Sequence, residues 1–165
     1  MEIDSLRKLY IEELKDIYSA EKQLIQAMPR MAKKTKNEKL RKGFEQHLET
    51  TRMQLERLDR IFEMIGKAPR GKKCKAMEGL IEEGKEMMQE DMDEDVMDAA
   101  LISSAQKIEH YEIASYGTVR TYANLLGEKE HVKLLQQTLD EEGNMDKQLT
   151  QLAESEINVE AMAEA

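Results

Sequence analysis

Apolar side chains recur along this chain at alternating steps of four and three residues, in four separate stretches. This spacing puts the members of each stretch on one face of an α-helix. In the first stretch a single acid interrupts the apolar run, so Glu21 points where a leucine is expected. That stripe reads Tyr10, Leu14, Ile17, Glu21, Leu24, Met28 and Met31.

The other three stretches are interrupted in the same way, each near its middle. The second stripe reads Leu40, Phe44, His47, Thr51, Leu55, Leu58, Phe62 and Ile65. In the third, Glu112 is central and Glu109 lies one turn earlier, toward the edge of the face. In the fourth, Glu142 interrupts the stripe and Asp146 follows a turn later, close to its edge. The pattern predicts a four-helix bundle with polar groups inside it.

Buried carboxylates need compensation, because each one costs several kcal/mol and several together repel one another. Lys and Arg are nearly absent from the four stripes. Protons shared between carboxyl groups, or a multivalent cation, are the remaining remedies. The stripes therefore predict either a metal site or a buried network of carboxyl, tyrosine and threonine groups that holds register without metal.

Composition supports an all-α fold in a single domain covering residues 1–165. Charged residues make up 36% of the chain and aromatic residues 4%, with only two prolines, which favours long helices over a sheet. We expect helices over residues 4–34, 38–65, 76–91, 96–126 and 128–157. The third of these is short and lies in a long connection between two helical hairpins. Such a crossover, containing an extra short helix, is typical of the ferritin-like class of bundle.

Charge and cysteine usage narrow the class of protein. The net charge of −9 disfavours binding to nucleic acid or to anionic membranes. No apolar run reaches the length of a membrane span, and a single cysteine, Cys74, allows no internal disulfide. We expect a cytoplasmic, soluble protein. Lysines flank Cys74 and would favour its thiolate if it is exposed, whereas a buried position would make it inert.

Several longer motifs resemble the YciE/YciF family, a stress-associated branch of the ferritin-like superfamily. They are Tyr-Ser-Ala-Glu-Lys-Gln-Leu at 18–24, Cys-Lys-Ala-Met-Glu-Gly-Leu-Ile-Glu-Glu at 74–83 and Glu-His-Tyr-Glu-Ile-Ala-Ser-Tyr-Gly-Thr at 109–118. The last is highly specific, and the resemblance covers most of the chain. It implies a cytoplasmic homodimer linked to stress responses, with an unidentified stress-protein partner and a di-metal site.

The wider superfamily places a Glu on one helix of each hairpin and a Glu-x-x-His pair on the other, which together hold iron or manganese. This chain departs from that pattern twice, because Met145 follows Glu142 by three residues and Thr50 follows His47 by three. We expect Glu21, Glu112 and Glu142 to be the main ligands for one or two ions. Glu109, His47 and Asp146 are expected to complete the site.

Two functions remain open from the sequence. One is a non-haem iron or manganese protein of oxidative or general stress defence. The other is a non-catalytic, dimeric interaction protein that keeps the fold with a relict or metal-free site. Whether the chain is an enzyme is left open.

Overall fold

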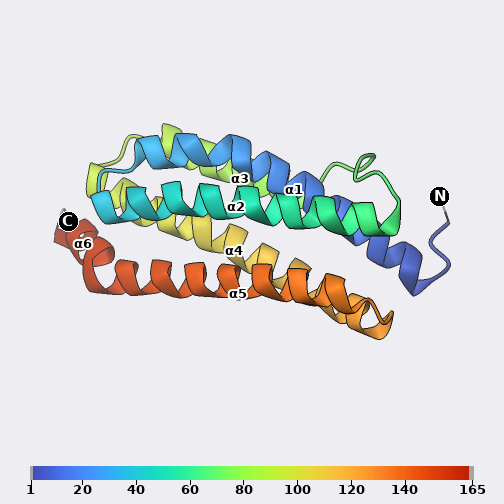
Figure 1. Ribbon diagram of the computed structural model, residues 1–165. Helices are drawn as coiled ribbons and strands as arrows, with labels where there is room; N and C mark the ends of the chain where they lie inside the picture. The colour runs from blue at the N-terminus through green and yellow to red at the C-terminus, as the bar shows by residue number, and fades with distance from the viewer. Residues whose placement is uncertain (1, 164–165) are drawn as a thin grey trace.

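The computed structural model of the protein describes residues 2–163, which are helical with short connections and contain no strand (Figure 1). The helices are α1 (Leu6–Lys34), α2 (Glu38–Ile65), α3 (Lys75–Gln89), α4 (Glu94–Leu125), α5 (Lys129–Leu152) and α6 (Asn158–Ala163), with a π-helical segment at Ala153–Ile157 between the last two. None of these helices is long and apolar enough to span a bilayer.

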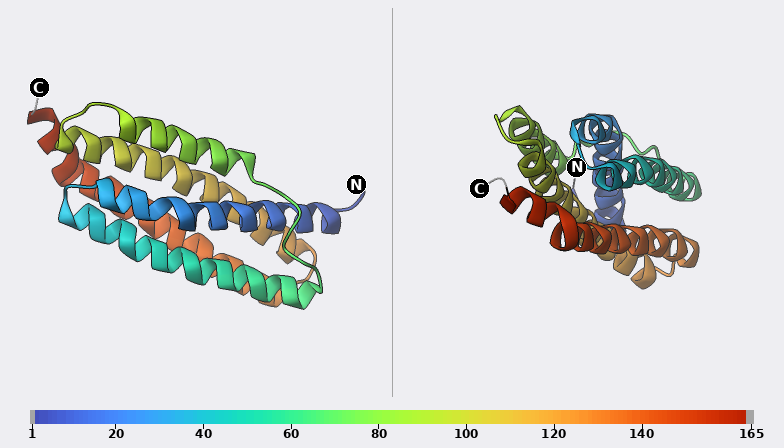
Figure 2. Two further views of the ribbon diagram at one scale, coloured as in Figure 1. Left: turned by 90° about the horizontal axis from the view of Figure 1, so that it is seen from above. Right: turned by 90° about the vertical axis from the view of Figure 1, so that its left-hand side faces the viewer.

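Four of the helices form the predicted bundle. α1 and α2 make one antiparallel hairpin, and α4 and α5 make the other (Figure 1). The connection between the hairpins runs back along the bundle, and its helix α3 packs on the outside against α1 and α4 (Figure 2). This crossover lets α2 and α4 run parallel. The all-α bundle with a long crossover and an extra short helix is confirmed.

Local signals explain where the first hairpin begins and turns. The Ser5 hydroxyl accepts a hydrogen bond from the Lys8 amide, and the Asn37 side chain accepts bonds from the amides of Lys39 and Leu40, which are N-terminal caps. α2 ends at Gly66, whose φ of 71° lies in the left-handed region where glycine carries little steric cost. Pro29 lies within α1, which continues to Lys34.

The final predicted helix, 128–157, differs most from the structure. Regular α-helix ends at Leu152, and a π-helical segment follows before α6 extends the chain to Ala163. Met145, Leu149, Ala153 and Ile157 are all buried at steps of four residues. Four residues overshoot one α-helical turn by about 40°, and the wider π-helical turn keeps Ile157 on the buried side.

Two apolar clusters fill the two ends of the bundle. The cluster at the α1–α2 turn contains Met31, Leu40, Phe44, Leu101, Leu149 and Ile157 among its members. The cluster at the other end includes Tyr10, Leu14, Leu58, Phe62, Tyr116 and Leu135. A third lies beneath α3 around Met28, Cys74 and Met77. Buried polar residues occupy the level between the two end clusters.

The stripe on α2 needs one correction. Leu55 is only partly buried, and the inward position belongs to Gln54, which is completely buried. Continuing the alternating steps of four and three from Leu40 leads through Thr51 to Gln54 and then to Leu58 and Ile61. The prediction from the sequence assigned Leu55 to the buried face because it is apolar, although the spacing of four and three residues leads to Gln54.

Candidate metal centre

Three helices bring four buried ionisable side chains together at the middle of the bundle. His47 comes from α2, Glu109 and Glu112 come from successive turns of α4, and Glu142 comes from α5. One ligand atom from each side chain can be chosen so that all four lie within 4.8 Å of one another. We call these four residues the central group.

His47 connects two of the carboxylates. Its Nδ1 atom lies 3.2 Å from Glu109 Oε1, and its Nε2 atom lies 3.6 Å from Glu142 Oε2. The imidazole ring is thus placed between α4 and α5, with 6% of its side chain exposed. It supplies the only nitrogen donor of the central group.

Glu21 approaches the same region from α1 and is completely buried. The hydroxyl of Tyr116 on α4 donates to Glu21 Oε1 at 2.5 Å, while Glu21 Oε2 has no hydrogen-bond partner among the described residues. Glu112 and Glu142 are both close enough to perturb its titration. Glu21 therefore borders the central group, with one oxygen held and the other free.

Unpaired buried atoms are concentrated here. Within residues 2–163, the buried polar atoms without a hydrogen-bond partner include both carboxylate oxygens of Glu112, one oxygen each from Glu109 and Glu142, and Nε2 of His47. Buried polar atoms in folded proteins nearly always have a partner. Several carboxylate oxygens with one imidazole nitrogen form a donor set suited to iron or manganese, so the residues present fit such an ion.

Burial and mutual repulsion dominate the electrostatics of the site. Burial, followed by the charge of Glu142, raises the pKa of Glu21 to about 8. Burial also raises the pKa values of Glu109 and Glu112 well above the ordinary range, with Glu142 again contributing. Burial acts in the same direction on Glu142, but the neighbouring Glu109 and His47 side chains outweigh it and lower its pKa. Near pH 7 the Glu21 carboxyl group of the metal-free site is therefore protonated, and the raised pKa values of Glu109 and Glu112 favour their protonated forms.

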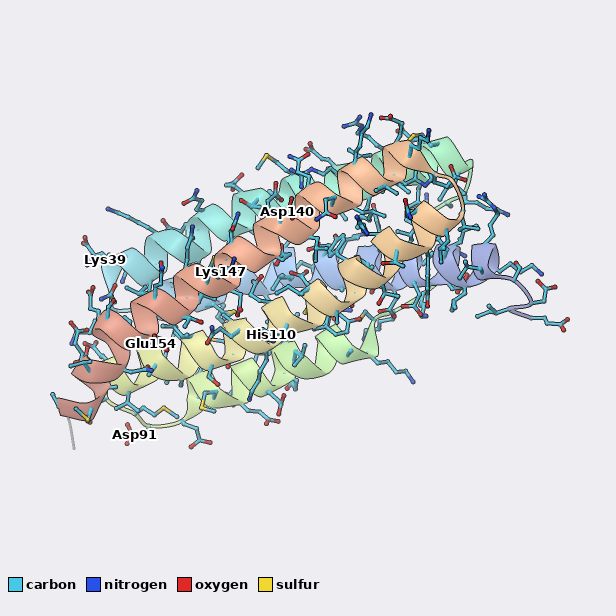
Figure 3. All side chains as sticks on the ribbon, turned by 90° about the horizontal axis from the view of Figure 1, so that it is seen from below. Lys39, Asp91, His110, Asp140, Lys147 and Glu154 are labelled. Atoms are coloured by element: carbon cyan, nitrogen blue, oxygen red, sulfur yellow. The ribbon has the colours of Figure 1, made fainter. Side chains whose placement is uncertain are left out.

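Asp146 lies apart from the central group. Its Oδ1 atom accepts a hydrogen bond from the Gln106 amide at 3.2 Å, and its Oδ2 atom lies 3.1 Å from His110 Nε2. His110 lies on α4 with 70% of its side chain exposed (Figure 3). Asp146 thus pairs with an outward-facing histidine at the seam between α4 and α5.

A second polar network, on the α2–α5 seam, was not identified from the sequence. Gln54 donates to Glu142 Oε1 and to Glu141 Oε2. Arg57 donates to both oxygens of Glu141 and to the Thr138 hydroxyl. The signal for Gln54 was its spacing from Thr51, as described above.

The two departures from the superfamily pattern have structural counterparts. Met145 packs in the apolar cluster at the α1–α2 turn, and Thr50 is only partly buried. Neither side chain belongs to the central group.

Cys74 is buried at the start of α3, where its sulfur lies 3.0 Å from the Tyr111 hydroxyl. Burial is the main cause that raises the pKa of the thiol. Despite the flanking lysines, burial favours the neutral thiol of Cys74 over the thiolate. This is the environment of an unreactive cysteine.

Sequence comparison places this architecture in a known family. Residues 5–162 match the profile of a family described as a domain of unknown function, DUF892. The chain is also 47% identical over 162 residues to Escherichia coli YciF, with 98% of each chain covered. This chain belongs to the YciF-like DUF892 family.

Solved structures of similar proteins have the same fold. The crystal structure of the E. coli stress protein YciF superposes with a TM-score of 0.91, covering 94% of this chain and 99% of that one. YcfI from Rhodopseudomonas palustris, described as a candidate structural protein, gives a TM-score of 0.88 at 41% identity, covering 90% and 95%. A protein from Xanthomonas campestris at 24% identity shares the fold, with a TM-score of 0.76 and 97% coverage of both chains.

Proposed function

We propose that this YciF-like protein binds iron or manganese at the central group and serves in oxidative or general stress defence. The observation that carries the proposal is the convergence of His47, Glu109, Glu112 and Glu142, with several of their buried atoms left unpaired. The description of E. coli YciF as a stress protein supports the stress role.

The chain's own residues would hold and shape the metal site. His47, Glu109, Glu112 and Glu142 are the proposed ligands, and Glu21 borders them from α1. Tyr116 orients Glu21, and Gln54 orients Glu142, through the hydrogen bonds described above. An iron or manganese ion bound there would supply a redox-capable Lewis acid. The apolar clusters on both sides exclude bulk water from the site.

Metal content tests this proposal directly. We expect one or two ions per chain in untagged protein purified without chelators from cells supplied with iron and manganese, measured by plasma mass spectrometry. Glu112→Gln keeps the shape of the side chain but removes its charge, so it should abolish uptake. The matched control Glu45→Gln, at an exposed position on α2, should retain it. Unchanged stoichiometry in Glu112→Gln would contradict the assignment.

A metal-free structural role is the second candidate, favoured by the two missing ligands and by the description of the R. palustris relative. In this case the carboxyl groups share protons and hold the register of the helices. Replacing Glu112 with Met would then leave the melting temperature unchanged or raise it. A large fall in melting temperature of the unaltered protein on chelation, reversed by added metal, would rule this candidate out.

We also propose that the protein is a cytoplasmic homodimer, in line with the expectation from the family resemblance. Met53 and Met64 on α2 are each about half exposed, and their spacing of eleven residues puts them on one face of the helix. An exposed apolar face of this kind suits contact with a second chain or with a stress-protein partner. Sedimentation equilibrium distinguishes a dimer from a monomer.

A further inference from the structure

The central group is sealed from solvent, which raises the question of how an ion reaches it. The side chains of His47, Glu109 and Glu142 are 6%, 1% and 0% exposed, and Glu112 is equally buried. A cation entering such a site needs polar atoms along its path, because passage between apolar side chains removes its water without replacement. The following inference rests on the proposed metal site.

One hydrogen-bonded path leads from the central group to the surface. Gln54 Nε2 donates to Glu142 Oε1 inside the bundle and to Glu141 Oε2, 3.0 Å away, at its edge. Glu141 and Glu142 are neighbours in α5, yet their side chains are 25% and 0% exposed. Among residues 2–163, Gln54 is the one side chain outside the central group that is hydrogen-bonded to it and also to a solvent-accessible carboxylate.

Arg57 holds the outer carboxylate in place. Its guanidinium donates to Glu141 Oε1 and Oε2, both at 2.7 Å, and to the Thr138 hydroxyl at 3.0 Å. A two-pronged arginine contact fixes the plane of a carboxylate. Glu141 is therefore a positioned, partly hydrated carboxylate next to the Gln54 amide, and it also perturbs the titration of buried Glu21.

The other possible routes lack this continuity. At the α4–α5 seam, the Asp146 carboxylate is bonded to Gln106 and His110, and neither residue is hydrogen-bonded to a member of the central group. Tyr116 does reach Glu21, but it is 1% exposed and belongs to the apolar cluster at the far end of the bundle. Neither route joins the central group to solvent through polar contacts.

We propose that Glu141 is the entry residue of the site: its carboxylate receives a divalent cation at the α2–α5 seam, and Gln54 links it to Glu142. Arg57 holds the Glu141 carboxylate in position for this step. In this assignment Glu141 controls the rate of loading, and the central group controls how much metal is bound at equilibrium.

Uptake kinetics separate these two roles. Metal-free protein is mixed with Co²⁺ in a stopped-flow instrument, and the visible absorption of bound cobalt is followed to its plateau. We expect Glu141→Gln to slow uptake on the order of tenfold, since it removes the charge that attracts the ion, and to leave the plateau unchanged. The matched control is Asp140→Asn. Asp140 precedes Glu141, is exposed on the outer side of α5 (Figure 3), and loses the same charge.

A double variant removes the main ambiguity. Glu141→Gln alone leaves the buried Arg57 charge unpaired, and that charge would repel an incoming cation. Arg57→Gln combined with Glu141→Gln removes both charges. Uptake that stays slow in the double variant supports a requirement for the Glu141 carboxylate, whereas recovery of the normal rate would overturn it.

The remaining outcomes are also decisive. Equal rates in Glu141→Gln and Asp140→Asn would overturn the entry role, and slowing by Asp146→Asn instead would move the path to the α4–α5 seam. Failure of the unaltered protein to bind cobalt at equilibrium would overturn the metal site itself. That result is distinguishable from slow uptake because the plateau would be missing.

Discussion

At the scale of single residues, two hydrogen bonds tie Glu142 of the central group and the neighbouring Glu21 to the rest of the molecule. Tyr116 on α4 holds Glu21 on α1, and Gln54 on α2 holds Glu142 on α5. Each bond joins one hairpin to the other at the level of the central group. Orientation of a carboxylate by such an outer partner raises the affinity of the site for metal without adding a ligand.

Removing the Tyr116 hydroxyl tests whether its hydrogen bond to Glu21 raises the metal affinity of the site. We expect Tyr116→Phe to lower metal affinity about tenfold, because Glu21 loses the donor that fixes its orientation. Competition with a chromophoric chelator measures the change. Tyr122→Phe, at a partly buried position two turns away on α4, is the control and should leave affinity unaltered. Equal affinities in the two variants would show that Tyr116 only packs.

Much of the candidate site was visible in the sequence at this scale. Glu21, His47, Glu112 and Glu142 interrupt apolar stripes, Glu109 lies toward the edge of one, and the structure brings all five to one level of the bundle. Asp146 follows Glu142 by four residues, and the resulting rotation of about 40° leaves it at the seam where His110 pairs with it. The pairing of Asp146 with His110 depends on the position of α4 beside α5. The periodicity of α5 alone cannot predict it.

At the scale of helices, one buried acid organises the turn of the first hairpin. Asp98 on α4 is 1% exposed, and its carboxylate accepts hydrogen bonds from the amides of Lys36 at 2.9 Å and Asn37 at 2.7 Å. These amides precede α2. The bonds therefore attach the α1–α2 turn to the start of α4 and set the height of one hairpin relative to the other.

Removing this acid should cost the fold more than removing a partly buried acid nearby. We expect Asp98→Ala to lower the free energy of unfolding by about 3 kcal/mol, because two backbone donors lose a charged acceptor. Urea denaturation measures the change. Asp95→Ala removes only an ion pair with the partly exposed Lys36 side chain, so it should cost less than about 1 kcal/mol. Similar losses in both variants would contradict the role given to Asp98.

The helices themselves were largely predictable. α2 has the expected bounds, and the others begin or end within a few residues of them, apart from the C-terminal region. The bounds of these helices follow from their apolar stripes and capping residues, which are features of the neighbouring sequence. Asp98 was missed because its two partners are about sixty residues away. The π-helical segment was missed because no local motif marks it, and its packing against α4 joins parts of the chain that are distant in sequence.

At the scale of the whole molecule, a layer of titratable groups separates two apolar clusters. Glu21, with a pKa raised to about 8, is protonated in the metal-free folded state near neutral pH, and burial raises the pKa values of Glu109 and Glu112 in the same direction. The unfolded chain titrates the same groups near pH 4.5. Between about pH 4.5 and about pH 8, the folded state therefore binds more protons than the unfolded state.

The metal-free protein should therefore lose stability as pH rises. For groups with raised pKa values, the stabilising contribution is complete below about pH 4.5 and is lost as pH increases through the folded-state pKa, here about 8 for Glu21. We expect the melting temperature in the presence of a chelator to fall steadily from pH 5 to pH 8.

Glu21→Gln provides the control, since it removes one titrating group and should flatten this dependence. Saturation with metal should also flatten it, because the bound cation replaces the protons. A melting temperature of the chelated protein that rises between pH 5 and pH 8 would show that the folded state keeps these carboxylates ionised.

The π-helical segment Ala153–Ile157 bears on how the length of this chain can change. A π-helical turn holds about one residue more than an α-helical turn, so this segment contains one residue that a regular α-helix would not need. Loss of one residue there would convert it to regular α-helix and leave α6 against the same side of α4. The same deletion within α4 or α5 would rotate every later side chain by about 100° and displace the members of the central group. Natural variation in length should therefore gather at Ala153–Ile157 and spare the helices that carry the site.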